Sequence, residues 1–187
     1  MNRFSEELNS RRKRNRKALA SFGIKANVSE GEIMYRTIRT GKGVDIFTIG
    51  YERRDGEDLI CALKDAGVDT LVDVREKPVS RKPDFRGKAL KELCENSGIV
   101  YYAMPSLGST GELRDRLRET GDFKQFRRRF ASLANRKMQK PLEELARLAT
   151  RRSIALLCYE RCHEECHRSI LADMLADSID ASVIAIP

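Results

Sequence analysis

Both histidines and three of the five cysteines of the chain fall within one short window, residues 157–168 (LCYERCHEECHR). Thiols can act as nucleophiles, and imidazoles and carboxylates can act as general acids or bases. We therefore predict an acid or base role for Glu160 or His167, and a nucleophilic role for Cys158 or Cys166. The expected reaction centre is this window.

Each of these side chains also has a structural interpretation, which the sequence leaves open. A thiol at the end of a buried strand, such as Cys158, can simply fill the core. Glu160 can cap the following helix by accepting from its first N–H groups. A spacing of four along that helix predicts a core-facing stripe of Cys162, Cys166, Ile170 and Met174.

Cysteine spacing argues against familiar metal and haem sites. The Cys158-x3-Cys162-x3-Cys166 pattern only approaches a radical iron–sulfur arrangement, and Cys162-x3-Cys166-His167 is one residue too long for c-type haem attachment. A zinc site from Cys158, Cys162, His163 and Cys166 fits by ligand type, but Cys158 is expected on a strand. Walker, dinucleotide-binding and nucleophile-elbow motifs are absent from the sequence. We accordingly predict no cofactor and no metal.

A second group of polar residues follows the other expected strands and the loop after them. Hydroxyl groups and guanidinium groups at such positions suit a phosphate or a carboxylate. Asp73 and Arg75 alternate onto one side of their strand, so an internal ion pair explains them as well as ligand contact does. The predicted ligand-binding residues are Tyr51, Asp73, Arg75, Ser80, Arg81 and Arg168.

The elements that must position these residues alternate between strand and helix. Apolar runs predict strands at 45–49, 70–74, 99–103, 153–158 and 182–186. Helical patterns lie at 57–66, 88–96, 112–119, 123–135, 141–150 and about 164–177. This order predicts an α/β fold with a single, mainly parallel sheet covered by helices on both faces, a Rossmann-like three-layer arrangement. Ligands bind such sheets at the carboxyl ends of the strands.

Positive charge is concentrated in residues 1–42, which hold 11 Lys and Arg against 4 Asp and Glu. Residues 43–187 hold 25 against 24, so we predict a basic extension (1–42) before one domain (43–187). Such a run of cations suits a polyanion, and we predict a nucleic-acid arm. The alternatives are a solvated arm that only raises solubility, a contact with a partner protein, or a contact with a membrane surface. The arm residues are Arg11, Arg12, Lys13, Arg14, Arg16 and Lys17.

Four stretches resemble the domain-of-unknown-function 488 (DUF488) family in the family's order. They are TIGYERRDGEDLI (48–60), LVDVREKPVSRKPDF (71–85), MPSLGS (104–109) and ALLCYERCHEECHRSILADML (155–175). The resemblance covers about residues 45–187 and implies a site without naming a reaction. Its motifs map to Gly50, Asp73, Arg75, Ser80, Arg81, Gly108, Cys158, Glu160, Cys166, His167 and Arg168. Cys162, His163 and the first 40 residues lie outside the pattern.

The sequence contains neither a spanning run of about 18 apolar residues nor a secretory signal, so we expect a cytoplasmic protein without membrane contact. The expected function is that of an enzyme with an anion-binding site, acting on a nucleotide, a nucleic acid or another anionic small molecule. The alternative is a non-catalytic binding module associated with nucleic acid. The reaction class does not follow from the sequence.

Overall fold

The computed structural model describes residues 43–187 of the chain. The basic extension, with the six cations predicted to bind nucleic acid, lies outside the described residues. Among those described, no helix is both long and apolar enough to cross a bilayer.

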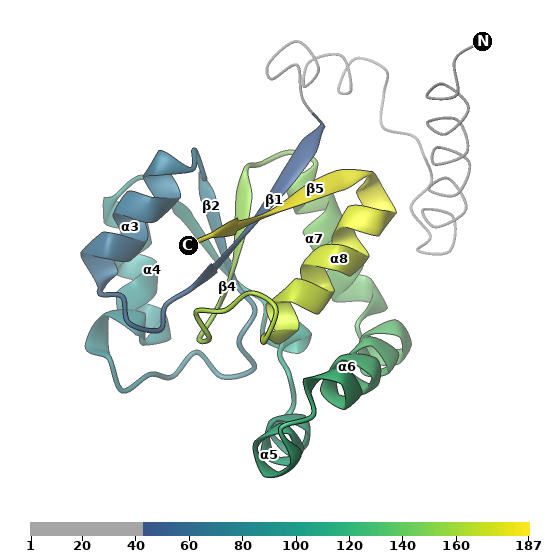
Figure 1. The fold of residues 1–187 in the computed structure, drawn as a ribbon. Coiled ribbons are helices and arrows are strands. Elements are labelled where there is room, and N and C mark those ends of the chain that lie inside the picture. The colour runs from purple at the N-terminus through teal and green to yellow at the C-terminus, as the bar shows by residue number, and fades with distance from the viewer. Residues whose placement is uncertain (1–42) are drawn as a thin grey trace, which may run out of the picture.

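Five parallel strands form one sheet in the order β3-β2-β4-β1-β5, visible in Figure 1. The strands are β1 (Val44–Gly50), β2 (Thr70–Asp73), β3 (Val100–Ala103), β4 (Ile154–Cys158) and β5 (Ala181–Ile186). β4 is the central strand and is buried at every position. A strand that is buried on both faces needs apolar side chains at every position, which explains the sequence IALLC.

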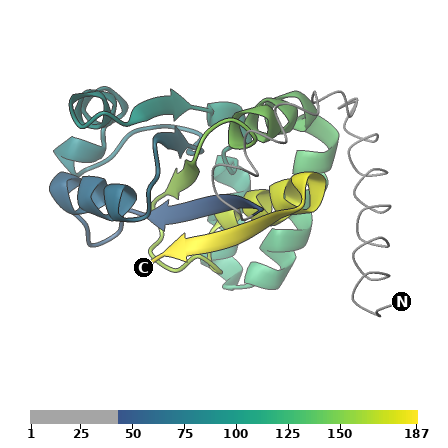
Figure 2. The ribbon, with the colours of Figure 1, turned by 90° about the horizontal axis from the view of Figure 1, so that it is seen from above.

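Helices cover both faces of the sheet, as the sequence predicts, and Figure 2 shows the strands between them. The α-helices are α3 (Gly56–Asp65), α4 (Gly87–Asn96), α5 (Gly111–Thr120), α6 (Phe123–Lys137), α7 (Gln139–Ala149) and α8 (His167–Ile179), with short 3-10 turns η1 (Pro83–Phe85) and η2 (Pro105–Leu107). α3 and α4 pack on one face, and α6, α7 and α8 pack on the other.

Strand residues alternate between two hydrophobic cores. Leu71 and Leu157 point toward α3 and α4, whereas Val72 and Leu156 point toward α6, α7 and α8. This period of two is the expected consequence of strand geometry. The sheet is therefore anchored from both sides, and its carboxyl edge is held in a fixed position.

The predicted start of the last helix is wrong. Residues before His167 form turns, and Cys166 is the N-cap of α8. Cys162 consequently does not lie on the helix, so the predicted stripe through Cys162 and Cys166 does not form. The cause is local: residues 159–165 are polar, and no apolar period marks where such a helix begins.

Candidate functional site

Three neighbouring strands end at the same edge of the sheet. Gly50 is paired with Cys158 in the β1–β4 register, and Asp73 is paired with Leu157 in the β2–β4 register. The prediction that the carboxyl ends of these strands lie together is confirmed. The loop between β4 and α8 crosses this edge and is visible in Figure 1.

Gly50 allows this loop to lie against the end of β1. A Cβ atom at this position would come within 1.9 Å of the Glu160 carbonyl oxygen. The loop is also joined to β1 by backbone hydrogen bonds, from Tyr51 N–H to the Cys158 carbonyl (3.2 Å) and from Glu52 N–H to the Tyr159 carbonyl (2.8 Å). Only glycine fits this close backbone approach.

Four predicted catalytic side chains converge under the loop, and we call them the thiol cluster: Cys158, Glu160, Cys166 and His167. Glu160 Oε2 accepts from Cys158 Sγ at 3.4 Å and from Cys166 Sγ at 3.0 Å. His167 Nδ1 lies 3.6 Å from Cys158 Sγ and 3.8 Å from Cys166 Sγ. Three of the four are buried, and Glu160 is partly exposed.

Two contacts fix the ring of His167. Its Nε2 lies 2.9 Å from the Val74 carbonyl, which can only accept, so Nε2 carries the proton. Phe130 packs edge-on against the ring, with centroids 5.3 Å apart. Nδ1 therefore faces both sulfur atoms. His167 is itself buried and only 6% exposed.

The electrostatics of the cluster follow from its burial. Burial and the nearby Cys166 raise the pKa of Glu160 to about 7. A hydrogen bond to Cys166, together with burial, raises the pKa of Cys158. Burial opposes ionisation of Cys166 and His167. A hydrogen bond with Cys158 and the charge of His167 nevertheless lower the pKa of the Cys166 thiol, and the nearby Cys166 raises the pKa of the imidazole. Cys166 and His167 thus favour a thiolate beside an imidazolium.

Arg168 lies buried behind the cluster and is only 1% exposed. Its guanidinium donates to the backbone carbonyls of Glu160 and Arg161. Its Nε has no hydrogen-bond partner among the described residues. Arg168 therefore holds the loop between β4 and α8 through two backbone carbonyls. Its positive charge is buried, so a bulky anion cannot contact it directly.

The second predicted group forms a closed network around Arg75, which we call the arginine network. Its Nε and Nη2 donate to the two Asp73 oxygens at 2.8 and 2.5 Å. Its Nη1 donates to Tyr51 Oη (3.1 Å) and to the Phe85 carbonyl (2.9 Å). Tyr101 Oη donates to the same Asp73 at 2.8 Å. Each terminal nitrogen of Arg75 is thus engaged within the protein.

The loop after β2 brings Ser80 and Arg81 to the rim of the site. Ser80 Oγ accepts from the Lys82 N–H at 3.1 Å, and Arg81 is exposed. Lys82, which sequence reasoning missed, donates through Nζ to the Tyr51 and Arg54 carbonyls at 3.2 and 2.6 Å. This lysine ties the loop to the end of β1.

Cys162 and His163 lie apart from the thiol cluster. Cys162 is exposed and donates to Glu164 at 3.2 Å. His163 Nδ1 shares a 2.8 Å hydrogen bond with Thr48 Oγ1. The zinc set that includes these two residues therefore does not assemble. Cys158, Cys166 and His167, by contrast, place one potential ligand atom each within 4.8 Å of one another.

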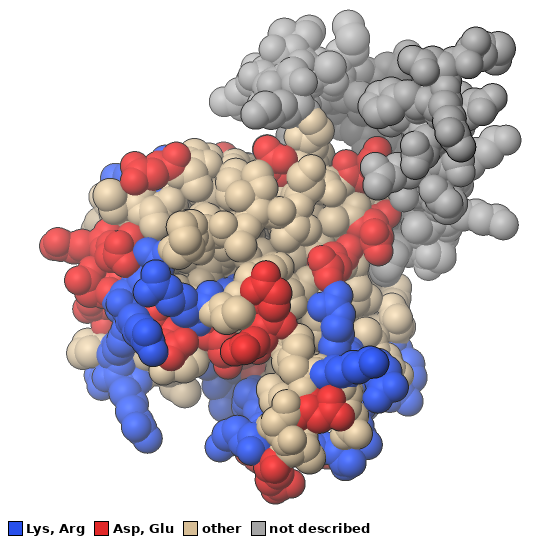
Figure 3. Space-filling view, in the orientation of Figure 1, with Lys and Arg blue, Asp and Glu red and all other residues tan. Residues whose placement is uncertain are grey.

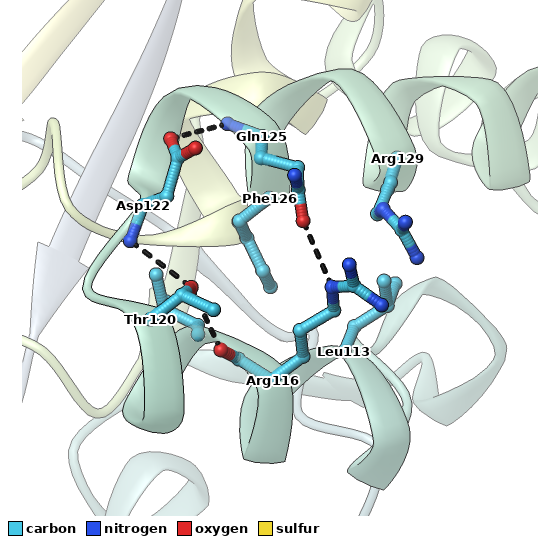
Figure 4. A pocket seen from close by; sticks show the side chains of 8 residues that line it. Leu113, Arg116, Thr120, Asp122, Gln125, Phe126 and Arg129 are labelled. Carbon is cyan, nitrogen blue, oxygen red and sulfur yellow. Dashed lines mark hydrogen bonds between the residues drawn. The ribbon is translucent and has the colours of Figure 1, made fainter.

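A small pocket between α5 and α6 contains none of the predicted site residues. Figure 4 shows Arg116 and Arg129 reaching toward it from the two helices. Arg116 Nε donates to Gln125 Oε1 at 2.8 Å. Leu113 and Phe126 form the apolar wall of the pocket. The residues that line the pocket include two arginines, Arg116 and Arg129, but no cysteine or histidine.

A family model described as "Domain of unknown function DUF488" matches residues 56–175. The match includes the arginine network except Tyr51, and it includes the entire thiol cluster. Comparison with curated proteins finds no match. Comparison with solved structures finds none either.

Proposed function

Because the chain belongs to the DUF488 family, whose description assigns no reaction, we propose from the geometry that the protein is an enzyme acting on nucleic acid. The reaction centre is the thiol cluster at the carboxyl edge of the sheet. The observation that carries the proposal is the segregation of positive charge on this face, where basic side chains lie on both sides of acidic ones (Figure 3), although the charges of residues 43–187 nearly balance.

Positive charge within these residues is strongly segregated. Segments 77–88 and 123–137 together hold 11 Lys and Arg against one acidic residue, and the remainder of 43–187 holds 14 against 23. Figure 3 shows two groups of basic side chains, one on each side of acidic side chains near the middle of this face. A polyanion is attracted to such flanks because phosphate contacts release counterions.

Contacts connect α6 with the cluster, and segment 77–88 with the neighbouring end of β1 through Lys82 and the Tyr51 carbonyl. In α6, Phe130 touches His167, and Arg127 pairs with Asp173 of α8. Within the described part of the chain, neither Arg128 nor Arg129 of α6 forms an ion pair. These exposed cations are available to phosphates. Arg75 and Arg168, which the sequence predicted to bind the ligand, are buried instead.

An exposed aromatic ring lies on the loop between β4 and α8. Tyr159 is 47% exposed and packs edge-on against Tyr51, with centroids 5.3 Å apart. An aromatic face beside cations is the usual platform for an unpaired base. This favours a single strand, or a strand end, as the substrate over an undistorted duplex.

The binding half of the proposal is tested by a salt titration of labelled single-stranded and duplex oligonucleotides. Arg128→Gln/Arg129→Gln should flatten the slope of log affinity against log salt by up to about 1.4 on a single strand. The matched control is Arg147→Gln/Arg151→Gln, which removes two exposed cations that precede β4 at the opposite edge. Equal slopes for the two variants would contradict binding at α6.

The same titration assigns the role of the basic extension. Deleting residues 1–20 removes seven Lys and Arg. If the folded segments bind the strand, the truncated chain keeps the sensitivity to Arg128→Gln/Arg129→Gln. If truncation abolishes binding, the extension carries the affinity and the proposed flanks are wrong.

Catalysis is tested on strands that the protein binds. Oligonucleotides incubated with the full chain are analysed by mass spectrometry for cleavage or base modification, with Cys166→Ser as the inactive variant. Product from the wild type alone supports an enzyme. Equal, undiminished binding by both proteins without product would establish the non-catalytic binding module instead.

A further inference from the structure

Three side chains of the thiol cluster, Cys158, Cys166 and His167, place one potential ligand atom each within 4.8 Å of one another, as ligands around one metal ion do. Zinc binds sulfur at about 2.3 Å and nitrogen or oxygen at about 2.0 to 2.2 Å, so neighbouring ligands of a tetrahedron lie about 3.3 to 3.8 Å apart. His167 Nδ1 lies 3.6 and 3.8 Å from the two sulfur atoms, within this range, and Glu160 Oε2 lies 3.4 and 3.0 Å from the same two atoms. The two sulfur atoms lie within 4.8 Å of each other.

The orientation of His167 matches that of a metal ligand. A ligating imidazole usually donates its second N–H to a carbonyl or a carboxylate, which fixes the tautomer and directs the other nitrogen at the ion. Here Nε2–H donates to the Val74 carbonyl at 2.9 Å, and Nδ1 faces both sulfur atoms. The support comes from the backbone of the residue that follows β2, outside the cluster.

The charges also balance around a divalent ion. Two thiolates and one carboxylate carry three negative charges, of which a divalent ion cancels two. Arg168, always protonated and only 1% exposed, supplies the remaining positive charge through its contacts with the Glu160 and Arg161 carbonyls. Buried charges persist in proteins when they are paired or coordinate a metal.

We infer that Cys158, Cys166 and His167 bind one zinc ion, and that Glu160, which contacts both sulfur atoms, offers a fourth ligand. Two thiolates with an imidazole are soft-to-intermediate ligands that select zinc over magnesium or calcium. Cys158, Cys166 and His167 are buried, whereas Glu160 is partly exposed. Three fixed ligands and one exchangeable position are the arrangement of catalytic zinc, so Glu160 is the ligand that water or substrate replaces.

This site differs from the zinc set that the cysteine spacing first suggested. Cys162 and His163 are replaced by Glu160 and His167, and the expectation of a metal-free protein is reversed. The inference goes beyond the proposed action on nucleic acid and does not depend on it. Zinc content and strand binding are separate measurements, so either can fail while the other holds.

The test is the zinc content of the full chain, purified with a tag that lacks histidine and without chelators. The wild type should contain about one zinc per chain by plasma mass spectrometry. Cys166→Ser and His167→Ala should lower the content at least tenfold. Glu160→Gln should retain zinc but release it about 10 to 100 times more readily to a competing chelator.

Cys162→Ser is the matched control, because its thiol is exposed and lies on the same loop. It should keep the wild-type zinc content. Cobalt substitution gives a second readout in the folded wild type: visible bands of a tetrahedral ion with sulfur-to-metal charge transfer. A wild type that takes up no zinc from a metal-buffered solution overturns the inference, as does loss of zinc in Cys162→Ser but not in Cys166→Ser.

Discussion

The carboxyl edge of the sheet carries two polar clusters that differ in how their groups are satisfied. In the arginine network, donors meet acceptors: Arg75 is held by both oxygens of Asp73, by Tyr51 and by the Phe85 carbonyl. In the thiol cluster, Glu160 Oε2 and His167 Nδ1 both face the same two sulfur atoms. The terminal nitrogens of Arg75 are all satisfied within the protein, whereas the second cluster brings three potential metal ligands within 4.8 Å of one another.

The difference distinguishes polar residues that stabilise the fold from polar residues that are available to bind a ligand, both at the carboxyl edge of the sheet. A buried arginine that is fully engaged by the protein stabilises the loop that it joins, and it has no donor left for a substrate. The groups of the thiol cluster contact one another as well, but each of them can also bind a cation, which the groups of the arginine network, engaged with one another, cannot. The two clusters should therefore respond differently to mutation and to metal removal.

The largest expected effect is on stability, from Arg75→Met. The variant leaves Asp73 buried without its partner, which typically costs about 3 to 5 kcal/mol. Urea unfolding followed by circular dichroism measures the loss. Arg118→Ala, which breaks an exposed pair with Asp115, should cost less than about 1 kcal/mol. Equal losses would mean that the arginine network does not stabilise the fold.

Gly50→Ala should come next, because the new methyl group meets the Glu160 backbone. We expect a loss of about 3 kcal/mol together with a lower zinc content, since Glu160 and its loop must move. Gly43→Ala is the control, because the nearest atom to its Cβ is 3.9 Å away. Unfolding curves and zinc analysis of both variants make the comparison, and unchanged zinc in Gly50→Ala would contradict the position of the loop.

Removal of zinc by a chelator should lower the stability of the protein through the thiol cluster and not through the arginine network. Free zinc at 100 times the dissociation constant stabilises a folded state that binds it by about 2.7 kcal/mol. Removal of zinc should lower the midpoint of unfolding in wild type but not in Cys166→Ser. Paired thermal melts with and without chelator provide the measurement. An equal drop in both proteins would assign the effect to another metal site.

The smallest effect is expected from Tyr101→Phe in the arginine network. It removes the 2.8 Å hydrogen bond to Asp73 but leaves the ion pair with Arg75. The free energy of unfolding should fall by about 1 to 3 kcal/mol, toward the lower end because Tyr101 is only partly buried. Zinc content should not change. A loss as large as that of Arg75→Met would show that the phenol, rather than the ion pair, holds the edge.

The sequence predicted the parallel sheet and its carboxyl edge because buried strands produce apolar runs that length and alternation reveal. It also singled out Cys158, Glu160, Cys166 and His167, since polar residues after a buried strand are conspicuous. It left the pairing of Asp73 and Arg75 open, because the deciding partner Tyr101 comes from β3. The start of α8 was missed for lack of any apolar period in residues 159–165.

The most direct test of the thiol cluster as a zinc centre is anomalous diffraction from crystals of the full chain equilibrated with zinc. Data collected above and below the zinc absorption edge locate the ion independently of any assumed ligand. We predict one peak about 2.3 Å from the sulfur atoms of both Cys158 and Cys166, with His167 Nδ1 also bound. No peak at this position, or a peak only at the exposed Cys162, would contradict the account.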